Sequence, residues 1–169
     1  MIENQYIDIF NQYRNIIDGK SVEGMNSLRD EAFEAFKKQG FPTKKLEDYL
    51  YLDVSAEFIP DYGLNINRVP FQGNPYTAFR CEIPNLTTNL YFVLNDLFHE
   101  KHLPHVTYPQ GVFVGSMKQF ALEQPEVFTK YYGSVANLYN NGIVAFNTMF
   151  AQDGFVIYVP KGIVVEKPI

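Results

Sequence analysis

The chain has 169 residues, of which 46% are apolar and 16% aromatic, and its formal net charge at pH 7 is −5. This composition is typical of a folded globular protein and excludes gross disorder. A negative chain without a basic face is a poor candidate for binding nucleic acid, because that affinity depends largely on neutralising phosphates. No apolar run approaches the roughly 18 residues that a membrane-spanning helix needs, so we expect neither nucleic acid nor membrane as a partner.

The N-terminus and the cysteine content favour a cytoplasmic location. The segment Met1–Tyr6 contains an early acidic residue and no basic region, so it does not have the features of a secretory signal peptide. Cys81 is the only cysteine of the chain. A single thiol excludes an internal disulfide, and it excludes the cysteine pairs of a zinc ribbon or a ferredoxin.

The N-terminal part of the chain predicts two amphipathic helices. Apolar residues recur at spacings of three and four over residues 2–17. A second helix is predicted from about Val22 to Gln39, capped by Ser21, with Arg29 mostly off its apolar face. Gly40 follows at a position that favours a positive φ.

A short helix of one or two turns is predicted after Gly40. Thr43 is a suitable N-cap, and Leu46 with Tyr49 or Leu50 would lie on the buried side. From about residue 55 to 88, prolines, glycines and asparagines predict short strands joined by turns, or irregular chain.

The following segments alternate between strand and loop signals. The apolar runs Leu90–Leu94 and Gly111–Gly115 are strand candidates. Residues 95–110 are expected to form a loop with a turn of helix.

The last third predicts helices and then β-structure. Ser116 opens a helical stretch, Pro125 can occupy the first position of another helix, and a last helical segment covers about 135–150. Residues 155–166 are β-rich and broken by a turn at Pro160–Gly162. We therefore expect a helical and mixed domain at 1–150, and at 151–169 the start of a second domain, cut at its boundary.

Three segments resemble the N-terminal part of SufD-type proteins of the SufB/SufD family. Residues 40–51 read GFPTKKLEDYLY, similar to a family signature GFPTxKxEDWKY, with Tyr49 in place of the usual Trp. Residues 29–36 resemble the family helix that precedes this signature. Residues 145–169 resemble a stretch that leads, in the family, into a right-handed parallel β-helix.

The resemblance implies both a fold and a function. The fold would be α+β, with an N-terminal helical region, a mixed middle with short strands, and the first strands of a truncated right-handed parallel β-helix. The function would be that of a non-catalytic scaffold that assembles iron–sulfur clusters with SufB-like and SufC-like (ABC ATPase) subunits. The cluster would belong to the assembled complex. Because the family's working residues match no position here, no catalytic or cofactor-binding residue is assigned.

A cluster of histidines suggests an alternative function. His99, His102 and His105 are the three histidines of the chain, and Glu100 lies among them. Imidazole and carboxylate groups are good ligands for zinc or iron. However, Pro104 prevents a regular helix through His105, and the spacing matches no known metalloprotease helix. The alternative is a metal-binding module or a small metal-dependent enzyme; the simpler interpretation is a polar loop.

Two further expectations follow from the resemblance. Cys81 could accept sulfur or bind a cluster, but Arg80 and Glu82 cancel locally in charge, and a small buried apolar residue is the simpler interpretation. The strand edges of residues 155–166 would be unpaired in a truncated chain. Such edges tend to pair with another chain, so we expect self-association.

Overall fold

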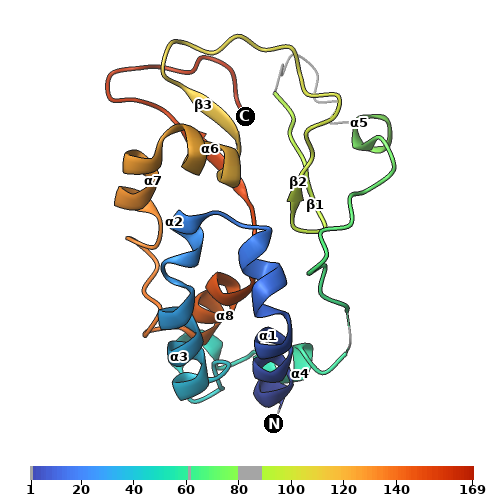
Figure 1. Ribbon diagram of the computed structural model, residues 1–169, viewed down its shortest axis with the longest axis vertical. Helices are drawn as coiled ribbons and strands as arrows, with labels where there is room; N and C mark the ends of the chain where they lie inside the picture. The colour runs from blue at the N-terminus through green and yellow to red at the C-terminus, as the bar shows by residue number, and fades with distance from the viewer. Residues whose placement is uncertain (1, 61, 80–88) are drawn as a thin grey trace.

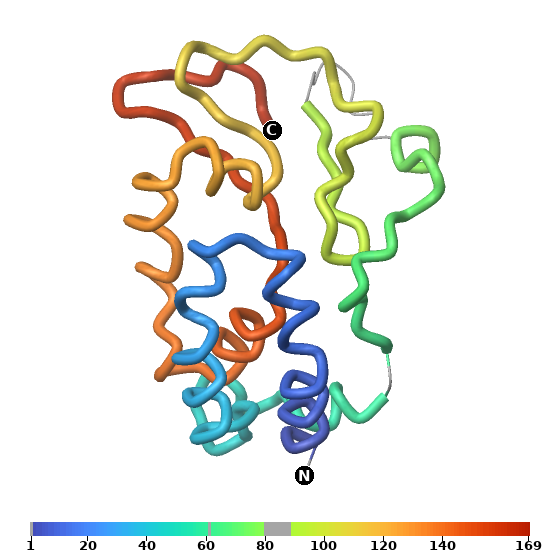
Figure 2. Tube along the Cα trace, in the orientation of Figure 1, coloured from blue at the N-terminus to red at the C-terminus, as the bar shows by residue number. Residues whose placement is uncertain are grey.

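The computed structural model describes residues 2–60, 62–79 and 89–169 (Figures 1 and 2). The elements in chain order are α1 (Ile2–Gly19), α2 (Glu23–Asn26), α3 (Arg29–Gln39), the 3₁₀ helix η1 (Glu47–Tyr49), α4 (Val54–Glu57), α5 (Pro75–Ala78), β1 (Val93–Leu94), β2 (Leu97–Phe98), β3 (Phe113–Ser116), α6 (Met117–Glu123), α7 (Pro125–Tyr131), α8 (Gly142–Phe150) and β4 (Phe155–Tyr158).

The first core forms where α1, α3 and α8 pack together, at the end of the molecule that holds the N-terminus (Figure 1). Its centre is a cluster of aromatic rings. Phe41 stacks on Phe58 with ring centroids 4.3 Å apart, and Tyr6, Phe36 and Phe146 meet Phe41 at 5.1–6.0 Å. Such offset and edge-on ring pairs add to the free energy gained by burying their apolar area.

A second, smaller core lies under the β3–β4 sheet. Met25 of α2 packs there with Phe120 of α6 and Phe128 of α7, all of them buried. The two strands run antiparallel, with Gly115 opposite Val156. This sheet and α6 and α7 lie near the end that holds the C-terminus (Figure 1).

The hairpin β1–β2 stands beside these two cores (Figure 1). Its turn residues, Asn95 and Asp96, have φ values of 51° and 63°. Two consecutive positive φ angles characterise the tight turn that matches the twist of a two-stranded ribbon. Phe98 attaches the hairpin to the sheet by stacking on Phe155, with ring centroids 5.7 Å apart.

Several local predictions are confirmed, as is the mixed α+β class. The first helix covers residues 2–19, and Gly40 has a φ of 64°. Ser116 caps α6 by accepting a hydrogen bond from Gln119 N, and Pro125 begins α7. The predicted turn is closed by a bond from Ile163 N to Pro160 O, and Gly162 has a φ of 83°.

The predicted helix from Val22 to Gln39 is wrong as one element. It is divided into α2 and α3, and Val22, not Ser21, is the N-cap of α2. Arg29, expected mostly off the apolar face, is completely buried. The physical reason is tertiary: its guanidinium satisfies groups that belong to other helices.

Two other helical predictions need correction. After Gly40 the predicted short helix is the single 3₁₀ turn η1; of the residues expected on its buried side, Tyr49 packs against the core, whereas Leu46 and Leu50 are each 49% exposed. The helix predicted for about 135–150 begins only at Gly142, because Asn141 provides the N-cap by accepting a hydrogen bond from Ile143 N.

The predicted β-structure differs in three places. The described parts of 55–88 form no strand: apart from the short helices α4 and α5 they are irregular chain, the second of the two predicted alternatives, and residues 95–110 contain β2 instead of a turn of helix. Beyond β4, the described residues form no second strand, and β4 pairs antiparallel with β3. The described residues thus show no parallel coil; the β-helix and the domain division after residue 150 stay predictions.

Candidate functional site

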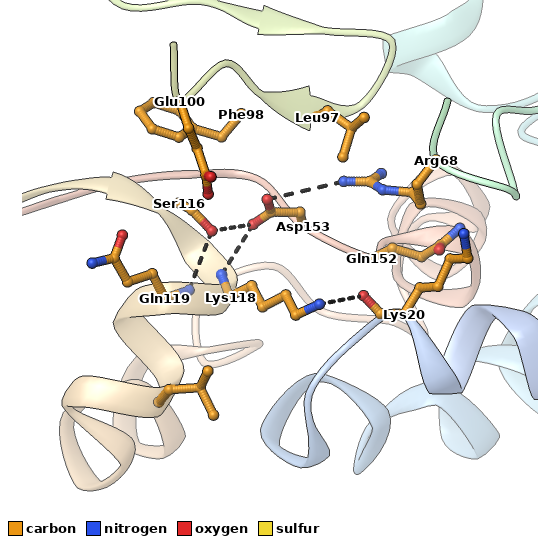
Figure 3. Close-up of a pocket in the computed structure, with 11 residues that line it drawn as sticks. Lys20, Arg68, Leu97, Phe98, Glu100, Ser116, Lys118, Gln119, Gln152 and Asp153 are labelled. Carbon is orange, nitrogen blue, oxygen red and sulfur yellow. Dashed lines mark hydrogen bonds and ion pairs between the residues drawn. The ribbon is translucent and has the colours of Figure 1, made fainter. Parts of the chain in front are cut away.

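A cavity of about 480 Å³ lies where five segments of the chain meet (Figure 3). The segments are the end of α1, the loop before α5, the strand β2, the start of α6, and the link between α8 and β4. The lining residues used below are Lys20, Arg68, Phe98, Glu100, Lys118 and Asp153. We call it the Arg68 cavity.

Asp153 organises the floor of this cavity. Its Oδ1 accepts hydrogen bonds from Ser116 Oγ at 2.9 Å and from Lys118 N at 3.0 Å (Figure 3). The next residue, Gly154, accepts a bond from Met117 N through its carbonyl oxygen. The link between α8 and β4 is therefore fixed to the start of α6, and the second carboxylate oxygen of Asp153 remains for Arg68.

Arg68 is positioned by a strained turn. Its φ is 55°, an unusual value for a residue with a side chain. Asn65 holds the turn, because its Oδ1 accepts from Val69 N at 2.8 Å and its Nδ2 donates to Asn95 O at 2.8 Å. This network ties the loop to the hairpin and directs the guanidinium toward Asp153 (Figure 3).

The guanidinium of Arg68 is buried but weakly compensated. The side chain is only 8% exposed, and its Nη2 lies 4.0 Å from Asp153 Oδ2. Nη2 makes no hydrogen bond within the described residues. Burial lowers the pKa of Arg68 below its ordinary value, although the nearby charges of Asp153 and Asp96 act to raise it.

Two ammonium groups add positive charge to the same wall. Lys118 Nζ donates to Lys20 O at 3.0 Å, and Lys20 Nζ donates to Asn67 O at 2.5 Å. Neither ammonium forms an ion pair with any carboxylate in the described ranges. The cavity thus carries three cations against Asp153 and the exposed Glu100, with the apolar Phe98 beside them.

This arrangement favours binding over bond-breaking chemistry. The Ser116 hydroxyl is committed to Asp153 and to Gln119 N. Within the described lining, no imidazole or thiol stands beside it to act as a base or nucleophile.

Arg68, Lys20 and Lys118 were not predicted as site residues from the sequence. Asp153 is not predicted as a site residue either, although it lies in residues 145–169, one of the segments that resemble the family.

The predicted histidine cluster is not gathered at one point. His99 is buried, with its ring centroid 6.3 Å from that of Tyr76, whereas His102 and His105 are exposed. His99 and His105 line different cavities. No group of three or more metal-ligating side chains was found in the part of the chain that the structure describes. Cys81 lies outside the described residues.

The segment that carries the GFPT-type signature has buried residues that anchor it to the core and exposed apolar residues beside them. Phe41 is buried, and Tyr49 accepts a hydrogen bond from Asn141 Nδ2 through its hydroxyl at 2.7 Å. Beyond this anchor, large apolar side chains face solvent. Their exposed fractions are 49% for Leu46, 49% for Leu50, 96% for Tyr51, 48% for Leu52 and 69% for Ile59. We call these five residues the 46–59 apolar surface.

Comparison with known proteins identifies the family. The family model described as the SufBD protein N-terminal region matches residues 1–169. Neither the search of curated proteins nor that of solved structures found a match. In the described residues, no helix has both the length and the apolar character required to cross a membrane. The chain therefore belongs to the SufB/SufD family of iron–sulfur cluster assembly proteins and corresponds to their N-terminal region.

Proposed function

We propose that this chain is the N-terminal region of a SufD-type protein, a non-catalytic scaffold and interaction subunit of a cytoplasmic iron–sulfur assembly complex. Its partners are a SufB-like subunit and a SufC-like ABC ATPase, and the cluster is the product of the assembled complex. The observation that carries the proposal is the family match over residues 1–169. The segments 29–36 and 40–51 favour the SufD type, because their sequences resemble SufD signatures.

The proposal extends to residues 151–169, which resemble the stretch that leads into a β-helix in SufD-type proteins. The turn at Pro160–Gly162 supports it, because a β-helix coil consists of short strands divided by such turns. A structure of the full-length protein tests this part. Parallel coils directly after residue 169 are expected, and an antiparallel domain at that place would contradict it.

The 46–59 apolar surface supports an interaction role. Water-exposed clusters of large apolar side chains mark sites of protein contact more often than scattered single residues do. Here five exposed apolar side chains fall within residues 46–59, in a segment that Phe41 and Tyr49 anchor to α8 and the aromatic core. The segment is therefore held in place by its buried half while its exposed half remains available to a partner subunit.

Co-purification of the full-length protein with SufB-like and SufC-like subunits tests this function. We expect a stable complex with the wild type and a weaker one with the double variant Leu50→Ser/Tyr51→Ser, since truncating one of the few large anchor residues of an interface costs more than about 1 kcal/mol. Tyr131→Ser is the matched control, because Tyr131 is 57% exposed on α7, away from this segment. Failure of the wild type to co-purify contradicts the scaffold role. Equal recovery of the double variant and the control contradicts only the role of the surface.

A further inference from the structure

The Arg68 cavity holds more cationic groups than its own carboxylates neutralise. Arg68, Lys20 and Lys118 line it together with two acidic residues, of which only Asp153 pairs with a cation, at 4.0 Å; Asp96, outside the lining, acts on Arg68 through its charge alone. A buried cation is stable when it has a close counter-charge and full hydrogen bonding. At 4.0 Å the Arg68–Asp153 pair satisfies neither requirement. A second anion beside Arg68 would therefore stabilise its buried positive charge.

Two buried polar groups at the cavity also have unused hydrogen-bonding capacity. Arg68 Nη2 and Gln152 Oε1 lack hydrogen-bond partners among the described residues. The Arg68 side chain is 8% exposed, and Gln152 is 3% exposed. Unsatisfied buried polar atoms of this kind are uncommon in native proteins and call for an explanation. A bound anion would add the counter-charge that Asp153, at 4.0 Å, supplies only in part.

The opposite wall of the cavity is apolar. Leu97 and Phe98 come from β2 and stand over Asp153 and Ser116 (Figure 3). Phe98 is held in place by its stacking on Phe155. A volume of about 480 Å³ is several times that of a bare oxyanion and lies within the range typical of small-molecule sites.

We propose that the Arg68 cavity binds a small organic anion, with its phosphate or carboxylate group on Arg68 and Lys118 and its apolar part against Leu97 and Phe98. The guanidinium of Arg68 presents two parallel N–H groups, which match the oxygens of such an anion. Glu100 lies on the same cavity and opposes the ligand by charge. The site is separate from the 46–59 apolar surface.

Titration of the purified chain with phenyl phosphate tests this proposal. We expect saturable binding with a Kd of about 1 mM or lower, measured by calorimetry or by NMR shifts. Inorganic phosphate, which lacks the apolar part, should bind at least several-fold more weakly, and phenol, which lacks the charge, should not saturate. No saturation with phenyl phosphate up to about 10 mM overturns the proposal. If phenol binds as tightly as phenyl phosphate, the anionic subsite is overturned. If inorganic phosphate binds as tightly as phenyl phosphate, the apolar subsite is overturned.

Charge variants of opposite sign locate the site. Arg68→Gln should weaken phenyl phosphate binding at least about tenfold, because it removes a charge-assisted hydrogen bond. Glu100→Gln should tighten it about threefold, because it removes a like charge. Lys161→Gln is the control, since Lys161 is an exposed residue of the Pro160–Gly162 turn outside the cavity.

Binding that responds equally to all three variants overturns the assignment to this cavity. If circular dichroism shows that Arg68→Gln does not fold, Lys118→Gln and Glu100→Gln decide the matter. Lys118→Gln must weaken binding and Glu100→Gln must tighten it; any other result contradicts the proposal.

Discussion

Arg29 connects its own helix, α3, to three other helices through one guanidinium. Its Nη1 donates to the carbonyl oxygens of Met149 and Ala151, at 2.7 and 2.9 Å, at the C-terminal end of α8. Its Nη2 donates to Asn26 Oδ1 at 2.8 Å, and its Nε lies 2.9 Å from Asp18 Oδ1. The side chain is fully buried, and desolvation lowers its pKa even though Asp18 acts in the opposite direction. The end of α8, where carbonyls lack intrahelical partners, thus depends on a residue of α3.

Replacing Arg29 with methionine should destabilise the protein strongly. The variant removes the cation, so the α8 carbonyl oxygens lose their partner and Asp18 keeps only Arg14. Breaking a buried pair from one side costs about 3–5 kcal/mol, so urea denaturation should show a loss of that size. Lys37→Met is the matched control: Lys37 pairs with Glu34 at 3.0 Å on the surface, and such pairs contribute about 1 kcal/mol or less. Similar losses in the two variants would contradict the role assigned to Arg29.

At the scale of elements, α8 approaches the start of the GFPT-type segment so closely that only glycine fits. A Cβ atom on Gly142 would lie 1.7 Å from the carbonyl oxygen of Gly40, far inside van der Waals contact. Gly142 is the first residue of α8, directly after its cap, Asn141. Asn141 also donates to Tyr49 Oη, so this one corner positions α8, Gly40 and η1.

Gly142→Ala should therefore be destabilising although alanine is the better helix former. The neighbouring atom belongs to the backbone and cannot rotate away, so α8 or residue 40 must move. Forced overpacking of this kind costs about 1–3 kcal/mol. Gly19→Ala, at the end of α1, is the control: a Cβ atom added there would meet no atom within 4 Å, so helix propensity should leave it unchanged or stabilise it by up to about 1 kcal/mol. The melting temperatures of both variants, measured by thermal unfolding, test this prediction. A melting temperature of Gly142→Ala equal to that of the wild type would contradict the close contact between Gly142 and Gly40.

Local signals predicted the elements whose ends depend on nearby residues. Ser116 and Pro125 start helices for reasons contained within a few residues, and both predictions were confirmed. β1 lies inside the predicted strand Leu90–Leu94, whereas β2 was missed because a strand of two residues is too short for an alternating pattern. Arg29 was placed on the polar side of a helix because periodicity cannot show carbonyl oxygens that arrive 120 residues later in the chain.

The Arg68 cavity could not be predicted for the same reason. Its residues come from five segments between Lys20 and Asp153, and no spacing within any one segment suggests a site. The histidines, by contrast, are adjacent in sequence but do not converge in space, because His99 belongs to the end of the hairpin while His102 and His105 lie on exposed chain beyond it.

On the scale of the whole molecule, the cavity lies at the junction of its parts. Lys20 follows α1 of the aromatic core, Lys118 lies on α6, which packs into the core beneath the sheet, and Phe98 belongs to the hairpin. Asp153 occupies the link from α8 to β4, which joins the two cores. An anion bound there would connect all three parts, and ligand binding to the folded state alone would raise its stability.

The β3–β4 sheet gives the last prediction, which concerns the assembly of whole chains. In the described residues β4 pairs only with β3, so its second edge has no strand beside it, and Ile157 is 47% exposed. Because an unpaired strand edge is a template for another chain, we expect this chain to self-associate through residues 155–166 as its concentration rises.

Light scattering over a concentration series should show a mass above that of the monomer. Ile157→Lys should reduce it, since a charged edge residue opposes strand pairing. Val135→Lys, at a site 93% exposed and outside the sheet, should not. A monomer at every concentration, or equal association of the two variants, would contradict pairing through β4.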